Sequence, residues 1–423
     1  MTRSGRRWIG GLLASLALLG LGTPVEAQHL LVPMDREQTD HLRAYGLTFW
    51  VLEQGERAEW LLNFQGGAFL LPDADGVRAQ AALRGVRVVP VGAAEVARIR
   101  GIVETGNMEA VPLEKAPRIA VYTPPNSTPW DDAVTMALEY AEIPYETVWD
   151  SEVMNGGLDD YDWLHLHHED FTGQYSKFYL TYAGAGWLQD EVARNQTVAQ
   201  QLGFPSVPAL KKGVASTIRD YVEGGGFLFA MCSATETLEL ALAAGPVDIA
   251  AAYSDGTPPD PDASQKMNWD RAMAFQDAQV QVSPTVSAFS DIDAHQVNTA
   301  WRKELGVFTL FDFSAKFDPV PAMLTQNHEA VLTDFYGLTT SFSEARLKPG
   351  TVVLAQEASW AKYIHGPLGE GTFTYFGGHD PEDPEHQIGD PQTDLTLHPN
   401  SPGYRLILNN VLFPAAKKKQ LKT

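Results

Sequence analysis

The strongest constraint on the fold of this chain is the alternation of strand-like and helix-like segments after residue 117. Four short segments have the composition of buried strands: "RIAVY" (118–122), "YETVWD" (145–150), "YDWLHLHH" (161–168) and "FLFAMC" (227–232). Two segments have the spacing and end signals of helices: "DDAVTMALEYAEI" (131–143) and "VASTIRDYVEGGG" (214–226). The alternation predicts an α/β fold with a doubly wound, mostly parallel sheet, which collects reactive groups at the carboxyl ends of its strands.

Residues 28–115 have a different pattern and predict a small α+β accessory domain. Three segments are expected to be strands or hairpins: "LTFWVLEQG" (47–55), "AEWLLNFQGGAFLLP" (58–72) and "VRVVPVG" (86–92). A short helix is expected at "DADGVRAQAALRGV" (73–86). The main α/β domain is then expected at 116–415, with a polar insertion at about 245–345. It resumes with strands in 351–358 and from 371, and ends in a helix that starts with Ser401 as N-cap and Pro402 at its first position.

The first 27 residues predict a secretory signal peptide. Arginines at positions 3, 6 and 7 precede the apolar run "WIGGLLASLALLGLG" (8–22), and small residues follow at Val25 and Ala27. The apolar run is too short and glycine-rich for a typical membrane span. We therefore expect an exported protein, periplasmic or extracellular, without a further membrane segment.

The composition narrows the classes of partner. The net charge of −22 and the lack of a basic stripe with interleaved aromatic residues argue against nucleic acid. A small molecule or a carbohydrate remains a possible ligand, since the chain holds 10 Trp and 14 Tyr. The loop "NGGLDDYDW" (155–163) resembles a pyrophosphate-binding loop only superficially, because its two aspartates would repel phosphate. No cofactor is therefore expected.

The single cysteine, Cys232, lies between an expected strand and an expected helix in "GGGFLFAMCSATE" (224–236). This order is typical of a nucleophile elbow, where the start of the helix supplies N–H groups for an oxyanion and lowers the pKa of the thiol. Good elbows have glycine two residues before and after the nucleophile, and here the flanking residues are Ala230 and Ala234. The alternative is a structural cysteine at the end of a core strand.

His379 is the candidate base. It follows a strand and two glycines in "GGHDPEDPEH" (377–386), so it can be exposed at the edge of the sheet. Glu382 could orient its ring and complete a nucleophile–base–orienter set with Cys232. Three other carboxylates compete with Glu382 for this role: Asp380, Asp383 and Glu385. An acidic loop with an incidental histidine is the alternative.

The segment "HLHHED" (165–170) supplies the remaining candidates. His167, His168 and Glu169 follow the third strand, and with Ser233 they are the expected substrate-binding residues. His165 is expected to be a satisfied interior residue. A zinc site that also uses His379 or His386 is conceivable, but no close metal-ligand motif such as H-E-x-x-H is present, so no metal is expected.

Together these residues resemble the class I glutamine amidotransferase-like superfamily, in the broad sense that includes ThuA-like proteins. The resemblance covers about 118–240 and 350–413, and rests on the order of elements, on "FLFAMCSATE" (227–236) and on "GGHDPE" (377–382). It implies a flavodoxin-like core with Cys232 as nucleophile, His379 as base and Glu382 as orienter. The chain departs from the superfamily in the spacing of His and Glu, in lacking glycine after the cysteine, and in "HHEDFTGQ" (167–174), which replaces the oxyanion loop.

The N-terminal segments "MDREQTDHLRAYGLTFW" (34–50) and "WLLNFQGGAFLLP" (60–72) are similar to secreted bacterial proteins labelled asparagine synthetase B-like. True synthetases place a cysteine after the initiator methionine, where this chain has Thr2, so asparagine synthesis is not expected.

Three functions follow as hypotheses. The first is an amide hydrolase that uses Cys232 and His379. The second is a catalytically inactive ThuA-like protein that binds carbohydrate or another small ligand. The third is a metal-dependent hydrolase that uses His167, His168 and His379.

Overall fold

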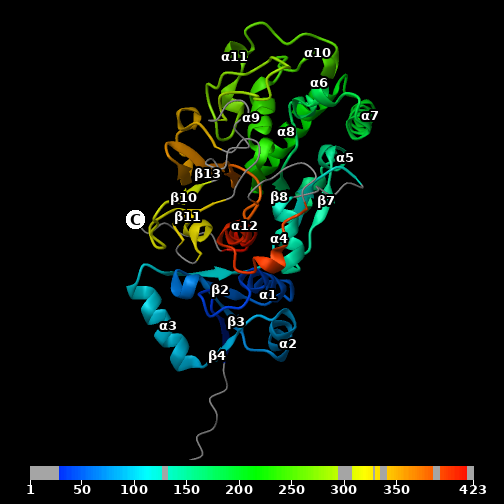
Figure 1. Cartoon of the computed structure of the whole chain (residues 1–423). Helices are drawn as coiled ribbons and strands as arrows, with labels where there is room; N and C mark the ends of the chain where they lie inside the picture. Colours follow the sequence, from blue (N-terminus) through cyan, green and yellow to red (C-terminus); the bar gives the residue numbers. More distant parts are fainter. Residues whose placement is uncertain are drawn as a thin grey trace, which may run out of the picture.

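The computed structural model describes residues 28–125, 132–293, 307–326, 329–333, 341–383 and 391–416. Within these ranges the chain forms a mixed α/β fold with one sheet of five strands and one of nine (Figure 1). The predicted signal peptide at 1–27 and the two acidic-loop residues Glu385 and His386 lie outside the described residues.

The five-stranded sheet belongs to the N-terminal region and is antiparallel throughout, in the order β4-β1-β3-β2-β5. Its strands are β1 (His29–Val32), β2 (Ala58–Leu62), β3 (Ala68–Pro72), β4 (Val89–Val91) and β5 (Glu109–Leu113). The helices of this region are α1 (His41–Glu53), α2 (Asp75–Arg84) and α3 (Ala93–Thr105). The expected helix at 73–86 is therefore confirmed as α2.

The expected strand at 47–55 is wrong, because residues 41–53 form helix α1. The carboxylate of Asp40 caps this helix by accepting the Arg43 N–H at 2.9 Å. Most of α1 is buried, so its sequence lacks the polar face that marks a surface helix. A Cβ on Gly46 would lie 1.7 Å from the carbonyl oxygen of Ala141, so glycine is needed for the close approach of α1 to helix α4 (Ala133–Ala141).

The nine-stranded sheet has the order β11-β10-β12-β13-β14-β9-β8-β6-β7. Its parallel part consists of β6 (Ile119–Tyr122), β7 (Glu146–Val148), β8 (Trp163–Leu166), β9 (Phe227–Met231) and β14 (Gly371–Phe376). The other strands pair antiparallel: β10 (Phe308–Leu310), β11 (Val331–Leu332), β12 (Val352–Glu357) and β13 (Trp360–Leu368). The sheet is thus mixed, and the expectation of a mostly parallel sheet holds only from β7 to β14.

The antiparallel part has two sequence origins. Strands β12, β13 and β14 follow one another through short connections, which favour antiparallel neighbours. Strands β10 and β11 come from the region 245–345 that was expected to be an insertion. Part of that region therefore extends the sheet.

Helices cover both faces of the parallel part. Trp163 and Phe229 share one hydrophobic core with α1, α4 and helix α12 (Pro402–Leu412). Leu164 and Ala230 point to the opposite core, built with α8 (Val207–Glu223) and α9 (Cys232–Ala244). Helices α5 (Asp150–Met154) and α7 (Gly186–Gln201) lie on that second side. The shorter helices are α6 (Tyr179–Tyr182), α10 (Ala252–Asp255) and α11 (Ala263–Lys266).

The final helix joins the two sheets. Ser401 caps α12 as predicted, since its hydroxyl accepts the Tyr404 N–H at 3.3 Å. The buried Arg405 donates to the carbonyls of Met34 and Gly66, at 3.2 and 2.5 Å, in the N-terminal region. In the described part of the chain, no helix is long and apolar enough to cross a membrane.

Candidate functional site

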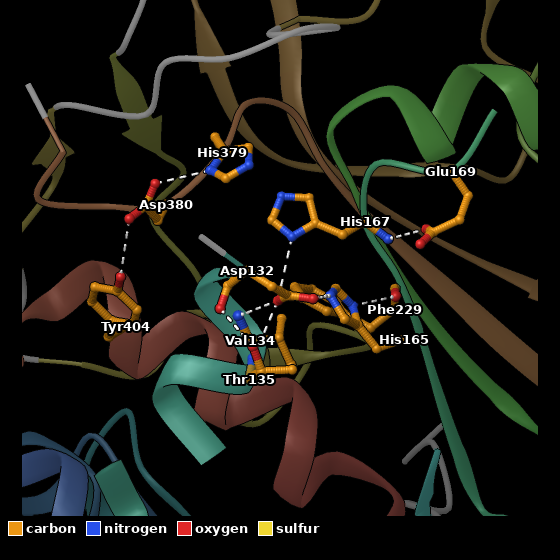
Figure 2. Close-up of polar contacts among 10 residues, drawn as sticks. All are labelled: Asp132, Val134, Thr135, His165, His167, Glu169, Phe229, His379, Asp380 and Tyr404. Carbon is orange, nitrogen blue, oxygen red and sulfur yellow. Dashed lines mark hydrogen bonds and ion pairs between the residues drawn. The ribbon is translucent and has the colours of Figure 1, made fainter. Parts of the chain in front are cut away.

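The site lies where the parallel strands β6, β8, β9 and β14 end. Parallel strands present their carboxyl ends at one edge, and this is where open α/β sheets bind ligands. The loops that follow these strands bring together a cysteine, several histidines and two buried aspartates. Figure 2 shows the aspartates, Asp132 and Asp380, with the histidines that they contact.

Cys232 occupies a tight turn between β9 and α9. Its backbone φ is +50°, a left-handed conformation that non-glycine residues adopt rarely and at a cost of about 1–3 kcal/mol. Its N–H donates to the carbonyl of Gly378 at 3.2 Å, which fixes the turn against the loop after β14. Ala230 and Ala234 on either side are fully buried, so small residues are needed there. This backbone geometry is that of a nucleophile elbow, although the cysteine is only 2% exposed.

His379 follows β14 and is oriented by its neighbour Asp380. Its Nδ1 lies 2.9 Å from an Asp380 carboxylate oxygen. The other oxygen of Asp380 accepts from the hydroxyl of Thr393 at 2.8 Å. It also accepts from the hydroxyl of Tyr404 at 3.4 Å (Figure 2). Both His379 and Asp380 are buried. This carboxylate is therefore held in place and fixes the imidazole ring.

Glu382, the expected orienter, lies elsewhere. Its carboxylate is 3.3 Å from Nδ1 of His398. The backbone explains the difference, because the chain turns after Pro381 and Glu382 itself has a φ of 71°. Asp380 therefore occupies the position beside His379 that the sequence assigned to Glu382.

Three imidazole rings pack against one another at this edge. The ring centroids of His167 and His168 are 4.0 Å apart, those of His167 and His379 4.1 Å, and those of His168 and His379 4.9 Å. The sulfur of Cys232 and one ring nitrogen each of His167 and His168 all lie within 4.8 Å of one another. We call Cys232, His167, His168 and His379 the rim cluster.

Asp132 and His165 lie beneath the rim cluster as a buried pair. Asp132 caps α4 by accepting the Val134 and Thr135 N–H groups, at 2.8 and 3.2 Å. Nε2 of His165 lies 3.1 Å from both carboxylate oxygens of Asp132. Burial opposes the charge on Asp132, but the His165 and His167 imidazoles hold the pKa of this carboxyl well below its usual range.

Both ring nitrogens of His165 have a partner within hydrogen-bond distance. Its Nδ1 lies 3.1 Å from the carbonyl oxygen of Phe229, and its Nε2 faces Asp132 (Figure 2). His165 thus has a partner at both ring nitrogens, as expected for an interior histidine.

His167 differs from His165 although both are buried. Its Nδ1 lies 3.3 Å from a carboxylate oxygen of Asp132. Within the described part of the chain, neither ring nitrogen has a hydrogen bond of good geometry. Burial and the neighbouring His168 lower the pKa of His167 to about 4, so the ring is neutral near pH 7. With Nδ1 toward Asp132, the lone pair lies on Nε2.

Helix α9 holds the loop that carries His167 and His168. The Ala234 N–H donates to the carbonyl of His167 at 3.0 Å, and the Ser233 hydroxyl donates to that of His168 at 3.0 Å. The Glu169 carboxylate accepts the His167 N–H at 2.9 Å. Ser233 therefore positions the histidine loop, where the sequence predicted substrate contact.

A cavity of about 330 Å³ lies beside the rim cluster. His168 and Glu169 line it, together with Trp149 after β7, Tyr175 in the loop after β8, and α7. The α7 residues that line it are Trp187, Glu191, Arg194 and Asn195. His168 thus connects this cavity to the cysteine.

Four residues that line the cavity carry buried polar atoms that have no hydrogen-bond partner within the described residues. They are Trp149 Nε1, Tyr175 Oη, Arg194 Nε and Asn195 Oδ1. Buried polar groups without partners are rare and costly in native proteins. Aromatic faces combined with such donors and acceptors are typical of a site for a small polar ligand.

The structure thus brings together Cys232, His379, His167, His168, Glu169 and Ser233, and separates Glu382 from them. Sequence reasoning missed the role of Asp132, although a carboxylate after the first parallel strand was a usable signal. It also missed the α7 residues, which no motif distinguishes.

Comparisons with known proteins add little. No family model matches the chain, and no curated protein matches it significantly. Among solved structures, the cytoplasmic protein STM3548 from Salmonella typhimurium is 11% identical, with a TM-score of 0.34 over 71% of this chain and 100% of that one. The cytoplasmic protein STM1381 from Salmonella typhimurium LT2 is 10% identical, with a TM-score of 0.30 over 71% of this chain and 99% of that one.

Proposed function

We propose that the chain is an exported, amidotransferase-like hydrolase that cleaves an amide or related acyl bond through Cys232. The observation that carries the proposal is the left-handed turn at Cys232. This turn places the thiol at the start of helix α9, next to the imidazoles of His167 and His168. The helices on both faces of the parallel strands agree with a doubly wound, flavodoxin-like core. The signal-like N-terminus supports export.

His379 is the proposed base, with Asp380 as the orienting group in place of Glu382. The thiol passes its proton to the imidazole, and the sulfur bonds to the carbonyl carbon of the substrate. The Ser233 N–H, which follows the thiol in the first turn of α9, stabilises the resulting oxyanion. The imidazolium returns the proton to the departing amine as the C–N bond breaks. Water then hydrolyses the thioester, releasing the acid and the free thiol.

The cavity beside His168 is the proposed site for the acyl part of the substrate. Its polar side chains, such as those of Arg194 and Asn195, would bind polar groups, while Trp149 and Trp187 would pack against apolar or planar parts.

A second candidate function is ligand binding without catalysis. It is favoured by the burial of Cys232, which leaves the sulfur with little access to solvent. The same cavity would then hold a carbohydrate or another small polar molecule.

Thiol alkylation separates the two candidates, since Cys232 is the only cysteine in the chain. The hydrolase proposal predicts fast reaction with iodoacetamide near neutral pH and a rate at least about tenfold lower in His379→Asn. His398→Asn, which changes a histidine bound to Glu382, is the matched control and should react like the wild type. Equal rates in all three proteins would leave only the binding function.

A further inference from the structure

We propose that the rim cluster is also a site for a thiophilic divalent metal ion of the Zn²⁺ type, bound by His167, His168 and Cys232. We further propose that this ion inhibits the thiol. The second statement rests on the proposed function, whereas the first depends only on the side chains that converge here.

The donor set suits such an ion. Two imidazole nitrogens and a thiol sulfur lie within 4.8 Å of one another. Zn²⁺ holds nitrogen at about 2.0–2.1 Å and sulfur at about 2.3 Å, so neighbouring ligand atoms of a tetrahedral site are roughly 3.3–3.8 Å apart. Side-chain rotations that draw the three atoms together by about 1 Å would complete this geometry. Three protein ligands leave the fourth position for water or a substrate atom.

His167 carries an independent sign of a missing ligand. The residue is 1% exposed, and its Nε2 has no hydrogen-bond partner in the described ranges. A buried nitrogen without a partner destabilises the empty site. A bound cation would give this nitrogen a partner, because a histidine ligates a metal through the lone pair of a ring nitrogen such as Nε2.

The surroundings of His167 are those of a metal ligand. Asp132 lies 3.3 Å from its Nδ1, on the opposite side of the ring from Nε2. A carboxylate in this position fixes the ring and makes the ligating nitrogen more basic. Helix α9 holds the same loop through the Ala234 N–H and the Ser233 hydroxyl. The ligand loop is therefore supported by contacts outside the cluster.

A competing set of side chains is less suitable. Asp132, His165 and His167 also lie close enough together to hold an ion. However, both nitrogens of His165 are already within hydrogen-bond distance of partners, namely the Phe229 carbonyl and Asp132, so this ring would have to break a contact to bind an ion. The set that includes Cys232 is therefore the one we assign.

Metal binding and thiol catalysis exclude each other. The metal binds sulfur as thiolate and the thiol proton leaves to solvent, so the electron pair that would attack a carbonyl carbon is used in the metal–sulfur bond. The ion would also lie between Cys232 and His168, and His168 is the residue that connects the cysteine to the cavity. Micromolar zinc would then inhibit the enzyme reversibly.

Cobalt titration of the full chain tests the binding. Co²⁺ should bind once per chain, with the visible bands of a tetrahedral site and a thiolate-to-cobalt charge-transfer band in the near ultraviolet. Cys232→Ser should lose the charge-transfer band. Asp132→Asn should weaken binding about 10–100-fold. His398→Asn is the control and should titrate like the wild type. Absence of the charge-transfer band in the wild type would overturn the site.

Protection of Cys232 from alkylation is a second test. It uses the wild-type protein, so it remains valid if the Asp132→Asn variant fails to fold. One equivalent of Zn²⁺ should protect Cys232 from iodoacetamide, and a chelator should restore the reaction. Mg²⁺ should not protect, since it prefers oxygen ligands. Lack of protection by Zn²⁺ would contradict the site.

The two proposals fail in different ways. A cobalt–thiolate band together with a thiol whose alkylation does not depend on His379 would refute the hydrolase and leave the metal site. Faster acyl transfer from p-nitrophenyl acetate with Zn²⁺ would refute inhibition and support a metal-dependent reaction instead.

Discussion

Two buried polar clusters of the nine-stranded sheet differ in how completely their atoms are paired. In the first, Lys211 donates to both oxygens of Asp150, at 3.0 and 2.9 Å, and to the Tyr122 hydroxyl at 3.1 Å. Its ammonium also lies 3.9 Å from the centre of the Trp149 ring. In the second, the rim cluster, the buried His167 has no well-formed hydrogen bond at either ring nitrogen within the described residues.

The difference separates a structural cluster from a candidate functional one. A buried ion pair whose charged atoms are all paired is stable in one arrangement. A buried imidazole with a lone pair available raises the free energy of the empty site and is compensated only when something binds. Both clusters come from the same sheet and neighbouring strands, so their chemistry depends on side chains and not on the fold.

The largest expected effect is on acyl transfer in the rim cluster. Cys232→Ser should lower acylation by p-nitrophenyl acetate by about 10⁴-fold or more, because a serine hydroxyl is a far weaker nucleophile than a thiolate. The melting temperature should change little, since the two side chains are similar in size. The release of p-nitrophenolate in the first turnover measures this. A burst that survives in Cys232→Ser would place the chemistry elsewhere.

The second effect concerns stability in the other cluster. Lys211→Met should lower the free energy of unfolding by about 3–5 kcal/mol, because it leaves Asp150 buried without a counter-charge. Lys212→Met is the matched control. That ammonium donates to the Val247 carbonyl and not to a carboxylate within the described residues, so about 1 kcal/mol is expected. Urea unfolding gives both values, and similar losses in the two variants would contradict the distinction.

The third effect is acid sensitivity from a buried histidine outside the rim. Burial and nearby Arg405 lower the pKa of His41 to about 4, while its value in the unfolded chain is near 6.5. The folded state therefore resists protonation. The stability from neutral His41 is complete above pH 6.5 and is lost as the pH falls to about 4, by about 3 kcal/mol. His41→Gln should flatten the dependence of unfolding free energy on pH in this range, and an unchanged slope would refute this assignment.

The smallest effect sharpens the choice of orienting carboxylate. Asp380→Asn should slow the acylation of Cys232 about 10²-fold, equivalent to about 2.7 kcal/mol, because His379 loses its anionic partner. Glu382→Gln changes a carboxylate that lies on His398 and should leave the rate near that of the wild type. The reverse order of effects would restore Glu382 as the orienter.

The sequence predicted those parts of the fold that have strong local signals. The short apolar strands around Trp163 and Phe229 and the cap at Ser401 were found because composition and end residues define them locally. Helix α1 was missed because its burial on nearly all sides removes the polar face that would identify it. The antiparallel half of the sheet was missed because strand pairing depends on contacts distant in sequence.

The site was predicted to a similar extent. Residues that directly follow strands, such as Cys232 and His379, could be placed at one edge from the order of elements. Which of Asp380 and Glu382 orients His379 could not be predicted from the sequence, because it depends on the backbone turn at position 382. The cavity residues Arg194 and Asn195 lie on a helix whose position the sequence does not determine.

The central claim is that Cys232 forms a covalent acyl intermediate, and peptide mapping after brief reaction with p-nitrophenyl acetate tests it most directly. The account predicts one acetyl group on the peptide that contains Cys232, removable by hydroxylamine and strongly reduced in His379→Asn. Acetylation confined to lysines, with Cys232 unmodified in the wild type, would contradict it.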